Sequence, residues 1–333
     1  MERVLQGHQI KDLNSKDLNK IMPGNKKTAT PSLSVEIGGI RLKNPLMAAS
    51  GVFGYGEEYG SLVDLNQFGA IVVKGISLTP REGNPIPRIC ETPCGMLNAI
   101  GLQNIGIDAF IVEKLPYLCG FDVPVIVNIF GQNITEFEEL AGRLDSTNGI
   151  SAIELNISCP NVKKGGMEFG KDPKMTYELV SSVKKITRLP VIAKLSPNVS
   201  DIVEIAKAAR DGGADGLSLI NTILGMAIDI DTRRPRLANI TGGLSGPAIK
   251  PIAIRMVWEV SNAIDIPIIG IGGICSHEDA IEFFLAGATA VAVGTAHFID
   301  PRIMIDIIRG LAGYMTRHKI EDVRDLIGGL KVS

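Results

Sequence analysis

Short apolar runs alternate with amphipathic stretches along the chain from about residue 33 onward. Each run places valine, isoleucine, leucine or alanine at consecutive positions, which is typical of strands that a parallel sheet buries on both faces. Eight runs are predicted to be strands, near residues 46–49, 70–73, 124–128, 152–156, 190–194, 216–220, 267–271 and 290–294. Eight strands that alternate with helices favour a single-domain α/β fold, the (β/α)8 TIM barrel.

Glycines mark the points where several of the intervening helices end. A helix passes through Gly-Ala or Gly-Gly-Ala into an apolar run at residues 65–75, 208–220 and 284–294. Glycine is the usual residue of the left-handed turn that closes a helix. Helices are predicted over 201–210 and 277–286, with Ser200 and Ser276 as their N-caps. A doubly wound sheet, the structural alternative, usually has one early glycine fingerprint, whereas here glycines follow many strands.

Composition and charge exclude several classes of function. The 333 residues carry 34 Lys and Arg against 36 Asp and Glu, and this formal charge of −2 gives no support for a nucleic-acid partner. Five cysteines without a CxxC pair, and no secretory signal, predict a reduced cytoplasmic protein without a disulfide framework or metal site. No apolar run approaches the roughly 20 residues that span a bilayer. We expect residues 1–32 to be a partly disordered N-terminal extension and residues 33–333 to form the barrel.

Glycine-rich loops follow the last strands of the predicted barrel. The carboxyl ends of barrel strands open into one shared mouth, so residues far apart in the sequence meet there. Gly272 and Gly273 follow the seventh strand, Gly294 and Thr295 follow the eighth, and a further loop, 241–246, follows the sixth. Bare backbone N–H groups at such loops bind phosphate. The three loops together therefore predict a phosphate site, although any single one reads equally well as a plain turn.

Two lysines and four asparagines are also expected at this mouth. Lys74 and Lys194 stand where apolar strands end, and a buried ammonium group needs an anionic or polar partner. Glu154 is the only nearby carboxylate in the predicted strands, and we expect both lysines to contact a ligand instead. An asparagine side chain offers one acceptor and two donors without charge, which suits a heterocyclic amide ring. The asparagines are Asn98, Asn128, Asn156 and Asn221.

Cys159 is the candidate titratable group of the mouth. It follows the fourth predicted strand in the segment ELNISCPNVKKGG, residues 154–166. A free thiol has a pKa near 8.5 and can act as a base at neutral to mildly alkaline pH. A small buried hydrophobe is the usual role of cysteine, but that role fits a proline-flanked loop poorly. Arg88, His277 and His318 give no persuasive catalytic signal, with His277 at a helix start and His318 in a polar tail.

Eight segments of the chain together resemble dihydroorotate dehydrogenase. They are AASGVFGYG (48–56), VVKGIS (72–77), NAIGLQN (98–104), ELNISCPNVKKGG (154–166), AKLSPN (193–198), GGLSGPAIKP (242–251), IGIGGI (269–274) and VAVGTA (291–296). The similarity covers the chain from about residue 33 to its C-terminus. Each segment alone is weakly specific, but NAIGLQN combined with NISCPN is specific to this family.

The resemblance implies the oxidation of (S)-dihydroorotate to orotate in pyrimidine synthesis, with one FMN per chain. A base removes a proton from C5 while a hydride passes from C6 to the flavin. Cysteine at the position of Cys159 implies class 1, and NVKKGGMEFG (161–170) is similar to class 1B. That class implies a homodimer core in a heterotetramer, in which a partner subunit carries FAD and an iron–sulfur cluster and passes electrons to NAD.

The resemblance also assigns roles to individual residues. Cys159 is the implied base. The implied FMN-binding residues are Ser50, Lys74, Gly75, Asn128, Asn156, Lys194, Ile220, Gly246, Gly272, Gly273, Gly294 and Thr295. The implied substrate-binding residues are Lys74, Asn98, Ala99, Ile100, Gly101, Leu102, Asn156, Asn221 and Thr222. Three alternatives remain: a fumarate-dependent class 1A enzyme, a barrel of the dihydropyrimidine dehydrogenase type, and a flavin-binding barrel without catalysis.

Overall fold

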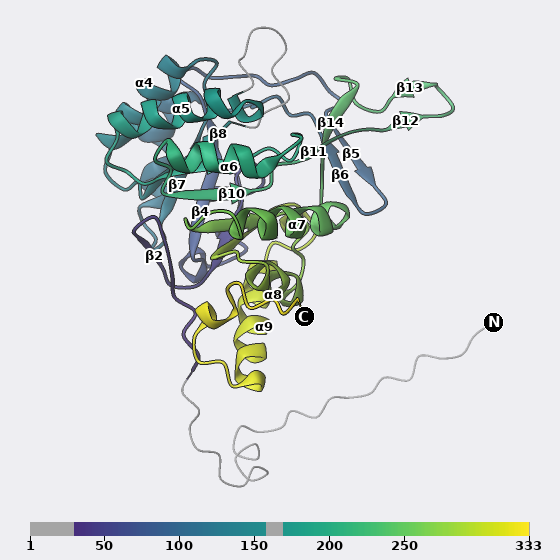
Figure 1. Ribbon diagram of the computed structural model, residues 1–333. Helices are drawn as coiled ribbons and strands as arrows, with labels where there is room; N and C mark the ends of the chain where they lie inside the picture. Colours follow the sequence, from purple (N-terminus) through teal and green to yellow (C-terminus); the bar gives the residue numbers. More distant parts are fainter. Residues whose placement is uncertain (1–29, 158–168, 333) are drawn as a thin grey trace, which may run out of the picture. The chain divides into compact units, whose positions relative to one another are not determined.

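The computed structural model describes residues 30–157 and 169–332 (Figure 1). The proposed N-terminal extension and the segment that contains Cys159 lie outside these residues, apart from the last three positions of the extension. Pro31–Ser333 form one compact unit, whose centre is a closed parallel barrel of eight strands. In barrel order the strands are β3 (Leu46–Ala48), β4 (Ala70–Ile76), β7 (Val125–Ile129), β8 (Ala152–Asn156), β9 (Val191–Lys194), β10 (Gly216–Leu219), β15 (Ile268–Ile271) and β16 (Ala290–Val293).

The predicted strands of the barrel are confirmed. Seven of them agree with the structure to within one residue at each end, and β4 extends three residues further, so that Lys74 lies inside the strand. The barrel closes where β16 pairs with β3, with Val291 opposite Leu46. All four residues of β16 are buried, as expected for a strand with the barrel interior on one face and helices on the other.

Helices surround the barrel and cover its apolar strands (Figure 1). Leu179, Val180 and Val183 of α5 are fully buried, because apolar residues recur along one face of that helix. The α-helices are α1 (Glu57–Gly60), α2 (Gly106–Ala109), α3 (Leu115–Leu118), α4 (Ile134–Asp145), α5 (Pro173–Ile186), α6 (Ile202–Asp211), α7 (Lys250–Ser261), α8 (His277–Leu285) and α9 (Ile303–His318). The 3-10 helices are η2 (Leu65–Gln67), η4 (Phe169–Lys171), η5 (Pro247–Ile249), η6 (Thr295–Phe298) and η7 (Val323–Leu326), and η3 (Phe110–Lys114) is a π-helix.

The helix ends confirm one predicted N-cap and correct another. The Ser276 side chain accepts a hydrogen bond from the backbone N–H of Asp279, as predicted. The cap of α6 is Asp201 and not Ser200, because the helix begins one residue later and the Asp201 carboxylate accepts from two backbone N–H groups. His318 ends α9 and therefore does not lie in a polar tail.

A second sheet, absent from the sequence prediction, lies at the mouth of the barrel. Its strands run antiparallel in the order β11 (Ile223–Met226), β14 (Thr241–Ser245), β6 (Gly95–Asn98) and β5 (Ile89–Thr92). Residues 241–246, predicted as a loop, mostly form β14, which pairs Gly243 with Asn98. Two short antiparallel pairs complete the strands. One is β1 (Val35–Ile37) with β2 (Ile40–Leu42), and the other is β12 (Ile228–Asp229) with β13 (Arg234–Pro235). The second pair forms a projecting arm, residues 228–235 (Figure 1).

No helix within the described residues is long and apolar enough to cross a bilayer.

Candidate active site

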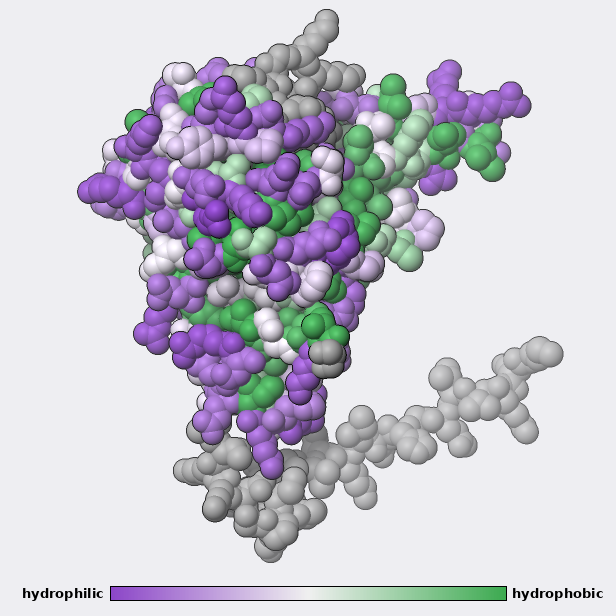
Figure 2. All heavy atoms as spheres, viewed as in Figure 1, coloured by the Kyte–Doolittle hydropathy of each residue, from purple (hydrophilic) through white to green (hydrophobic). Residues whose placement is uncertain are grey.

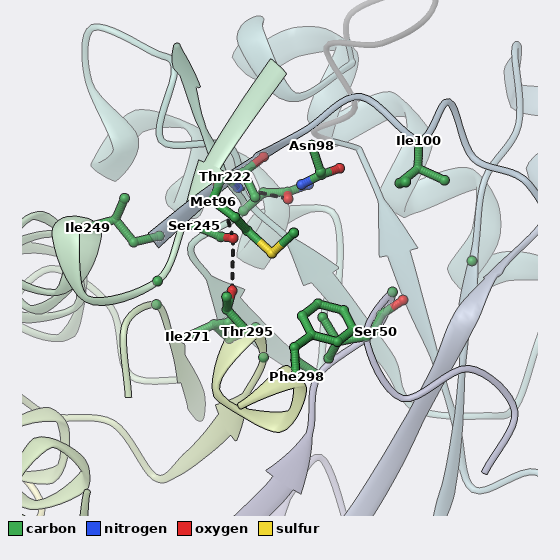
Figure 3. Close-up of a pocket in the computed structure, with 18 of the residues that line it drawn as sticks. Ser50, Met96, Asn98, Ile100, Thr222, Ser245, Ile249, Ile271, Thr295 and Phe298 are labelled. Atoms are coloured by element: carbon green, nitrogen blue, oxygen red, sulfur yellow. Dashed lines mark hydrogen bonds between the residues drawn. The ribbon is translucent and has the colours of Figure 1, made fainter. Parts of the chain in front are cut away.

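A cavity of about 390 Å³ lies at the carboxyl ends of the barrel strands. Residues at the ends of all eight barrel strands line it, and the second sheet contributes further residues from the opposite side. Figure 3 shows this arrangement, with Met96, Asn98 and Ser245 of the sheet above Ser50, Ile271 and Thr295 of the barrel. The predicted convergence of strand ends on one mouth is therefore confirmed.

The cavity brings together nearly all the residues that the sequence singled out. All four asparagines line it, and so do Lys74 and Lys194. The remaining cavity-lining residues from the prediction are Ser50, Gly75, Ile100, Gly101, Leu102, Ile220, Thr222, Gly246, Gly272, Gly273, Gly294 and Thr295. Ala99 does not line the cavity, because its side chain packs against Leu97 and Leu237. Cys159 lies outside the described residues.

A buried carboxylate lies directly behind the cavity wall. Glu154 of β8 is 1% exposed and is not a cavity-lining residue. Its Oε2 accepts a hydrogen bond of 2.6 Å from Asn128 Nδ2, and its Oε1 accepts one of 2.8 Å from Ser218 Oγ. Lys194 Nζ lies 3.7 Å from Oε2, within ion-pair distance. Glu154, the one nearby carboxylate noted in the sequence, is therefore a partner of Lys194, and contact between the cavity-lining Lys194 and a ligand stays a prediction.

The amide oxygen of Asn128 has no hydrogen-bond partner among the described residues. A carboxylate can only accept, so the amide group that faces Glu154 must be the NH₂, and Oδ1 must face away from it. Oδ1 is buried and receives no hydrogen bond from the described residues. Gly75 lies beside it, and a Cβ on Gly75 would approach Oδ1 to 2.7 Å. The side chain of Asn128 is therefore a fixed acceptor in the cavity wall, next to a position where only glycine leaves room.

Lys74 and Arg88 form a cationic end of the cavity. Arg88, set aside on sequence grounds, lines the cavity and donates a 2.6 Å hydrogen bond from Nη2 to Gln103 Oε1. Desolvation is the main cause that lowers the pKa of Lys74 below its usual value, and the charge of Arg88 lowers it further. Within the described part of the chain, no aspartate, glutamate or histidine lines the cavity. This end of the cavity therefore suits an anionic group of a ligand.

The glycine loops meet at the other end. Thr295 Oγ1 donates a 2.8 Å hydrogen bond to Ser245 Oγ, which ties the loop after β16 to β14 (Figure 3). Gly246 has φ +95°, and a Cβ there would lie 2.7 Å from Cα of Gly95. Gly273 has φ +74°, and its Cβ would meet the carbonyl oxygen of Gly246 at 2.9 Å. Glycine is thus required both by backbone conformation and by the close approach of the loops.

His297 packs against the loop that follows β16. Its ring is buried beside Phe53 and Tyr59, and its Nδ1 lies 3.2 Å from the carbonyl oxygen of Gly294. Because a carbonyl only accepts, Nδ1 carries the proton. Nε2 has no hydrogen-bond partner among the described residues. Burial lowers the pKa of His297 to about 4, so the ring is neutral near pH 7.

Several residues of the cavity were not predicted from the sequence. Arg88, Met96, Gln103, Ser245 and Phe298 all line it. Met96 and Ser245 belong to the second sheet, whose four-residue strands lack a clear alternation of apolar and polar positions. Arg88 carried one usable signal, its position ten residues before Asn98 in a segment rich in proline and glycine. Such segments are typical of binding loops.

Comparison with known proteins decides the family. The model of the family described as "Dihydroorotate dehydrogenase" matches residues 32–315. The chain belongs to the dihydroorotate dehydrogenase family. The family resemblance seen in the sequence is confirmed, and so is the barrel.

Relatives within the dihydroorotate dehydrogenase family share about three fifths of the aligned residues. A protein of Geotalea daltonii is 60% identical over 304 residues, which cover 91% of this chain and 100% of that protein. Proteins of Thermoanaerobacter sp. (strain X514) and Geobacter sulfurreducens are 59% and 60% identical, over 90% and 91% of this chain and 99% of each relative. All three are called "Dihydroorotate dehydrogenase B (NAD(+)), catalytic subunit".

Proposed function

We propose that this protein oxidises (S)-dihydroorotate to orotate in pyrimidine biosynthesis, and passes the electrons to NAD through a partner subunit. The observation that carries the proposal is the cavity itself, which combines glycine loops, neutral amides and a cationic end in a dihydroorotate dehydrogenase barrel. The names of the relatives support the same substrate and the same acceptor. We also propose that residues 1–32 form an N-terminal extension and that residues 33–333 form the barrel.

The residues present fit FMN. The unpartnered Oδ1 of Asn128 beside Gly75 needs a hydrogen-bond donor, as a flavin ring N–H provides. The loops of Gly246, Gly273 and Gly294 offer backbone N–H groups for a phosphate. FMN, when bound, supplies the acceptor for the hydride that leaves C6 of the substrate. We assign its binding to Ser50, Lys74, Gly75, Asn128, Asn156, Lys194, Ile220, Gly246, Gly272, Gly273, Gly294 and Thr295.

The substrate would lie between the sheet and the barrel ends. Asn98, Asn156 and Asn221 can donate to and accept from the pyrimidine ring without placing a charge against it. Lys74 and Arg88 can pair with the substrate carboxylate. The run Ile100, Gly101 and Leu102 and residue Thr222 complete the proposed contacts. Ala99 belongs to this run through its backbone, which donates to the carbonyl oxygen of Arg88 and accepts from the Asn84 side chain.

Cys159 is the proposed base that removes the proton from C5. It follows the cavity-lining Asn156 by three residues in the sequence. The titratable groups among the described cavity-lining residues are Lys74, Arg88, Lys194 and Cys275. Burial raises the pKa of Cys275, which opposes formation of a thiolate there, and the lysines are used in binding. General-base assistance contributes typically 10²–10⁴ in rate.

A partner subunit is part of the proposal. The relatives are each called a catalytic subunit, and this wording supports a second subunit, for which we propose FAD and an iron–sulfur cluster. We also propose that two copies of this chain form the core of a heterotetramer. An apolar surface on β11 and the arm supports this contact (Figure 2). Its exposed residues are Leu224, Met226, Ile228 and Ile230.

Anaerobic absorbance spectra of the FMN-loaded protein test the reaction. We expect dihydroorotate to bleach the flavin, and dihydrouracil to leave it oxidised. The variant Cys159→Ala should bind FMN equally well and be reduced at least about 100-fold more slowly, and Cys159→Ser should be intermediate. A wild-type flavin that dihydroorotate does not bleach would refute the proposed oxidation, and an Ala variant as fast as wild type would refute the assigned base.

Steady-state assays test the acceptor. The catalytic chain alone should not reduce fumarate efficiently, whereas the complex with its flavin–iron–sulfur subunit should reduce NAD. Efficient fumarate reduction by the isolated chain would instead favour a class 1A enzyme. Sedimentation of the isolated chain tests the dimer, which Ile230→Asp on the exposed arm should weaken, while Ile86→Asp, at an exposed position outside the arm, serves as the matched control.

A further inference from the structure

Glu154 occupies a position that the proposed reaction does not explain. The carboxylate lies among four neighbouring barrel strands, β7, β8, β9 and β10, and contacts one polar side chain from each of the other three. Asn128 stands directly opposite Glu154 in the register of β7 and β8, and Ser218 stands opposite Lys194 in β10 and β9. Of these four residues, only Asn128 and Lys194 line the cavity. Glu154 therefore reaches a cavity ligand only through those two side chains.

The first effect of Glu154 is on the direction of the Asn128 amide. The 2.6 Å hydrogen bond to Oε2 requires the NH₂ of Asn128 to face the carboxylate. The opposite orientation would set two acceptor oxygens against each other in a buried place, where such a contact is costly. The amide oxygen is thereby committed to the cavity as an acceptor. Without the carboxylate, either orientation of the amide becomes possible.

The second effect of Glu154 is on the charge at the cavity wall. Lys194 is 6% exposed, and Glu154 is the one carboxylate within ion-pair distance of its Nζ among the described residues. A buried ammonium group without a counterion presents a full positive charge to whatever lies beside it. With Glu154 ionised, the pair is neutral overall. The carboxylate therefore reduces the positive potential that the cavity presents near Lys194.

We infer that Glu154 is a positioning residue that sets the reduction potential of the bound flavin, by offsetting the charge of Lys194 and by fixing Asn128 as an acceptor. The inference rests on the proposed function, because it requires FMN in the cavity. Reduction of a flavin places negative charge on its ring system, and a nearby positive charge stabilises that form. Removal of the Glu154 charge thus makes the flavin easier to reduce.

The test is a measurement of the flavin midpoint potential in Glu154→Gln, by spectroscopic titration against a reference dye. We expect the equilibrium constant for two-electron reduction to increase at least tenfold, which corresponds to a positive shift of about 30 mV. The affinity for FMN, measured by fluorescence quenching, should fall about three- to tenfold, because Asn128 loses its fixed orientation. The conservative variant Glu154→Asp retains the charge and should keep the potential within about 15 mV of wild type.

Two controls separate charge from structure. Asp215 directly precedes β10, at the opposite end of the barrel from the cavity, and pairs with Lys184 of α5. Asp215→Asn removes this carboxylate and should leave the potential unchanged. Ser218→Ala removes one hydrogen bond from Glu154 and keeps both charges, so it should shift the potential by less than about 15 mV. A potential in Glu154→Gln that stays within about 15 mV of wild type would overturn the inference.

A double variant keeps the inference testable if Glu154→Gln alone does not fold. In the double variant Glu154→Gln with Lys194→Met, no buried charge is left unpaired. If Glu154 offsets Lys194, the double variant keeps nearly the wild-type potential; if Glu154 has no effect on the potential, loss of the lysine alone lowers it by about 30 mV or more. That lower value would also overturn the inference. A wild-type protein that fails to bind FMN, or that dihydroorotate does not bleach, would refute the proposed function instead.

Discussion

Protonation of His297 is expected to destabilise the fold below about pH 6.5. The pKa of the folded-state imidazole lies at about 4, against an ordinary value of 6.5. Between these two values the unfolded chain binds a proton that the folded chain excludes, so the free energy of unfolding falls as the pH falls. The difference of about 2.5 units corresponds to roughly 3 kcal/mol at 1.36 kcal/mol per unit. This loss is complete by about pH 4 and absent above about pH 7.

The structure gives the reason for the large shift. Nδ1 already donates to Gly294, and the described residues leave Nε2 without an acceptor for a second proton. The buried rings of Phe53 and Tyr59 beside the imidazole cannot solvate a cation as water does. Asp300 offers a weak opposing attraction.

Urea unfolding at a series of pH values from 7.5 to 4.5 measures this effect. The matched variant is His297→Phe, which keeps a ring beside Phe53 and cannot titrate. Carboxylates contribute equally to both proteins, so the difference between their two pH profiles isolates His297. We expect wild type to lose about 2–3 kcal/mol more than the variant across this range. Parallel profiles would refute the assignment of a neutral, low-pKa histidine.

Three further perturbations probe the cavity and the core. Arg88→Ala should raise the KM for dihydroorotate about 10- to 100-fold with FMN still bound. Steady-state kinetics measure the KM and a flavin spectrum measures the bound FMN; an unchanged KM would show that Arg88 does not face the substrate. Gly246→Ala should destabilise the fold by about 1–3 kcal/mol and weaken FMN binding, since its Cβ would lie 2.7 Å from Gly95 Cα; Gly39→Ala, also at positive φ but with open space around it, is the control, and equal losses in both would contradict a steric cause. Leu179→Ala on the buried face of α5 should cost about 2–5 kcal/mol in thermal or urea unfolding, against about 0.5 kcal/mol or less for Tyr177→Ala on its exposed face.

The barrel and most of its mouth could be predicted from the sequence because strong patterns define them. Consecutive β-branched residues mark strands buried on both faces, and barrel topology then requires the strand ends to converge. Asn128, Asn156 and Asn221 meet in the cavity for this reason, whereas Asn98 reaches it from β6 of the second sheet. The second sheet gave no such signal, because its strands pair residues far apart in the chain, such as Asn98 with Gly243. Pairing at that sequence distance is determined by tertiary structure and not by local periodicity.

The sequence named Glu154 as a possible partner of Lys194 but did not favour that ion pair, for a different reason. The helix α5 lies between Glu154 in β8 and Lys194 in β9 along the sequence, and the residues that end each strand suggested a ligand instead. Only the register of β8 and β9, which sets Asn156 opposite Lys194, brings the carboxylate below it within reach. Arg88 was missed likewise, because its position follows from a loop whose path no periodic pattern describes.

The pairing of β6 with β14 fixes the distance between two points of the cavity wall. Asn98 at the end of β6 and Gly246 just beyond β14 lie on adjacent, hydrogen-bonded strands, so their separation is fixed by the register of Leu97 opposite Leu244. A slip of one residue would move the two by about 3.3 Å along the strands and turn every side chain of β14 to the other face. Because Asn98 is assigned to the substrate and Gly246 to FMN, this register fixes how far the proposed substrate contact lies from the proposed cofactor contact, whatever side chains surround them.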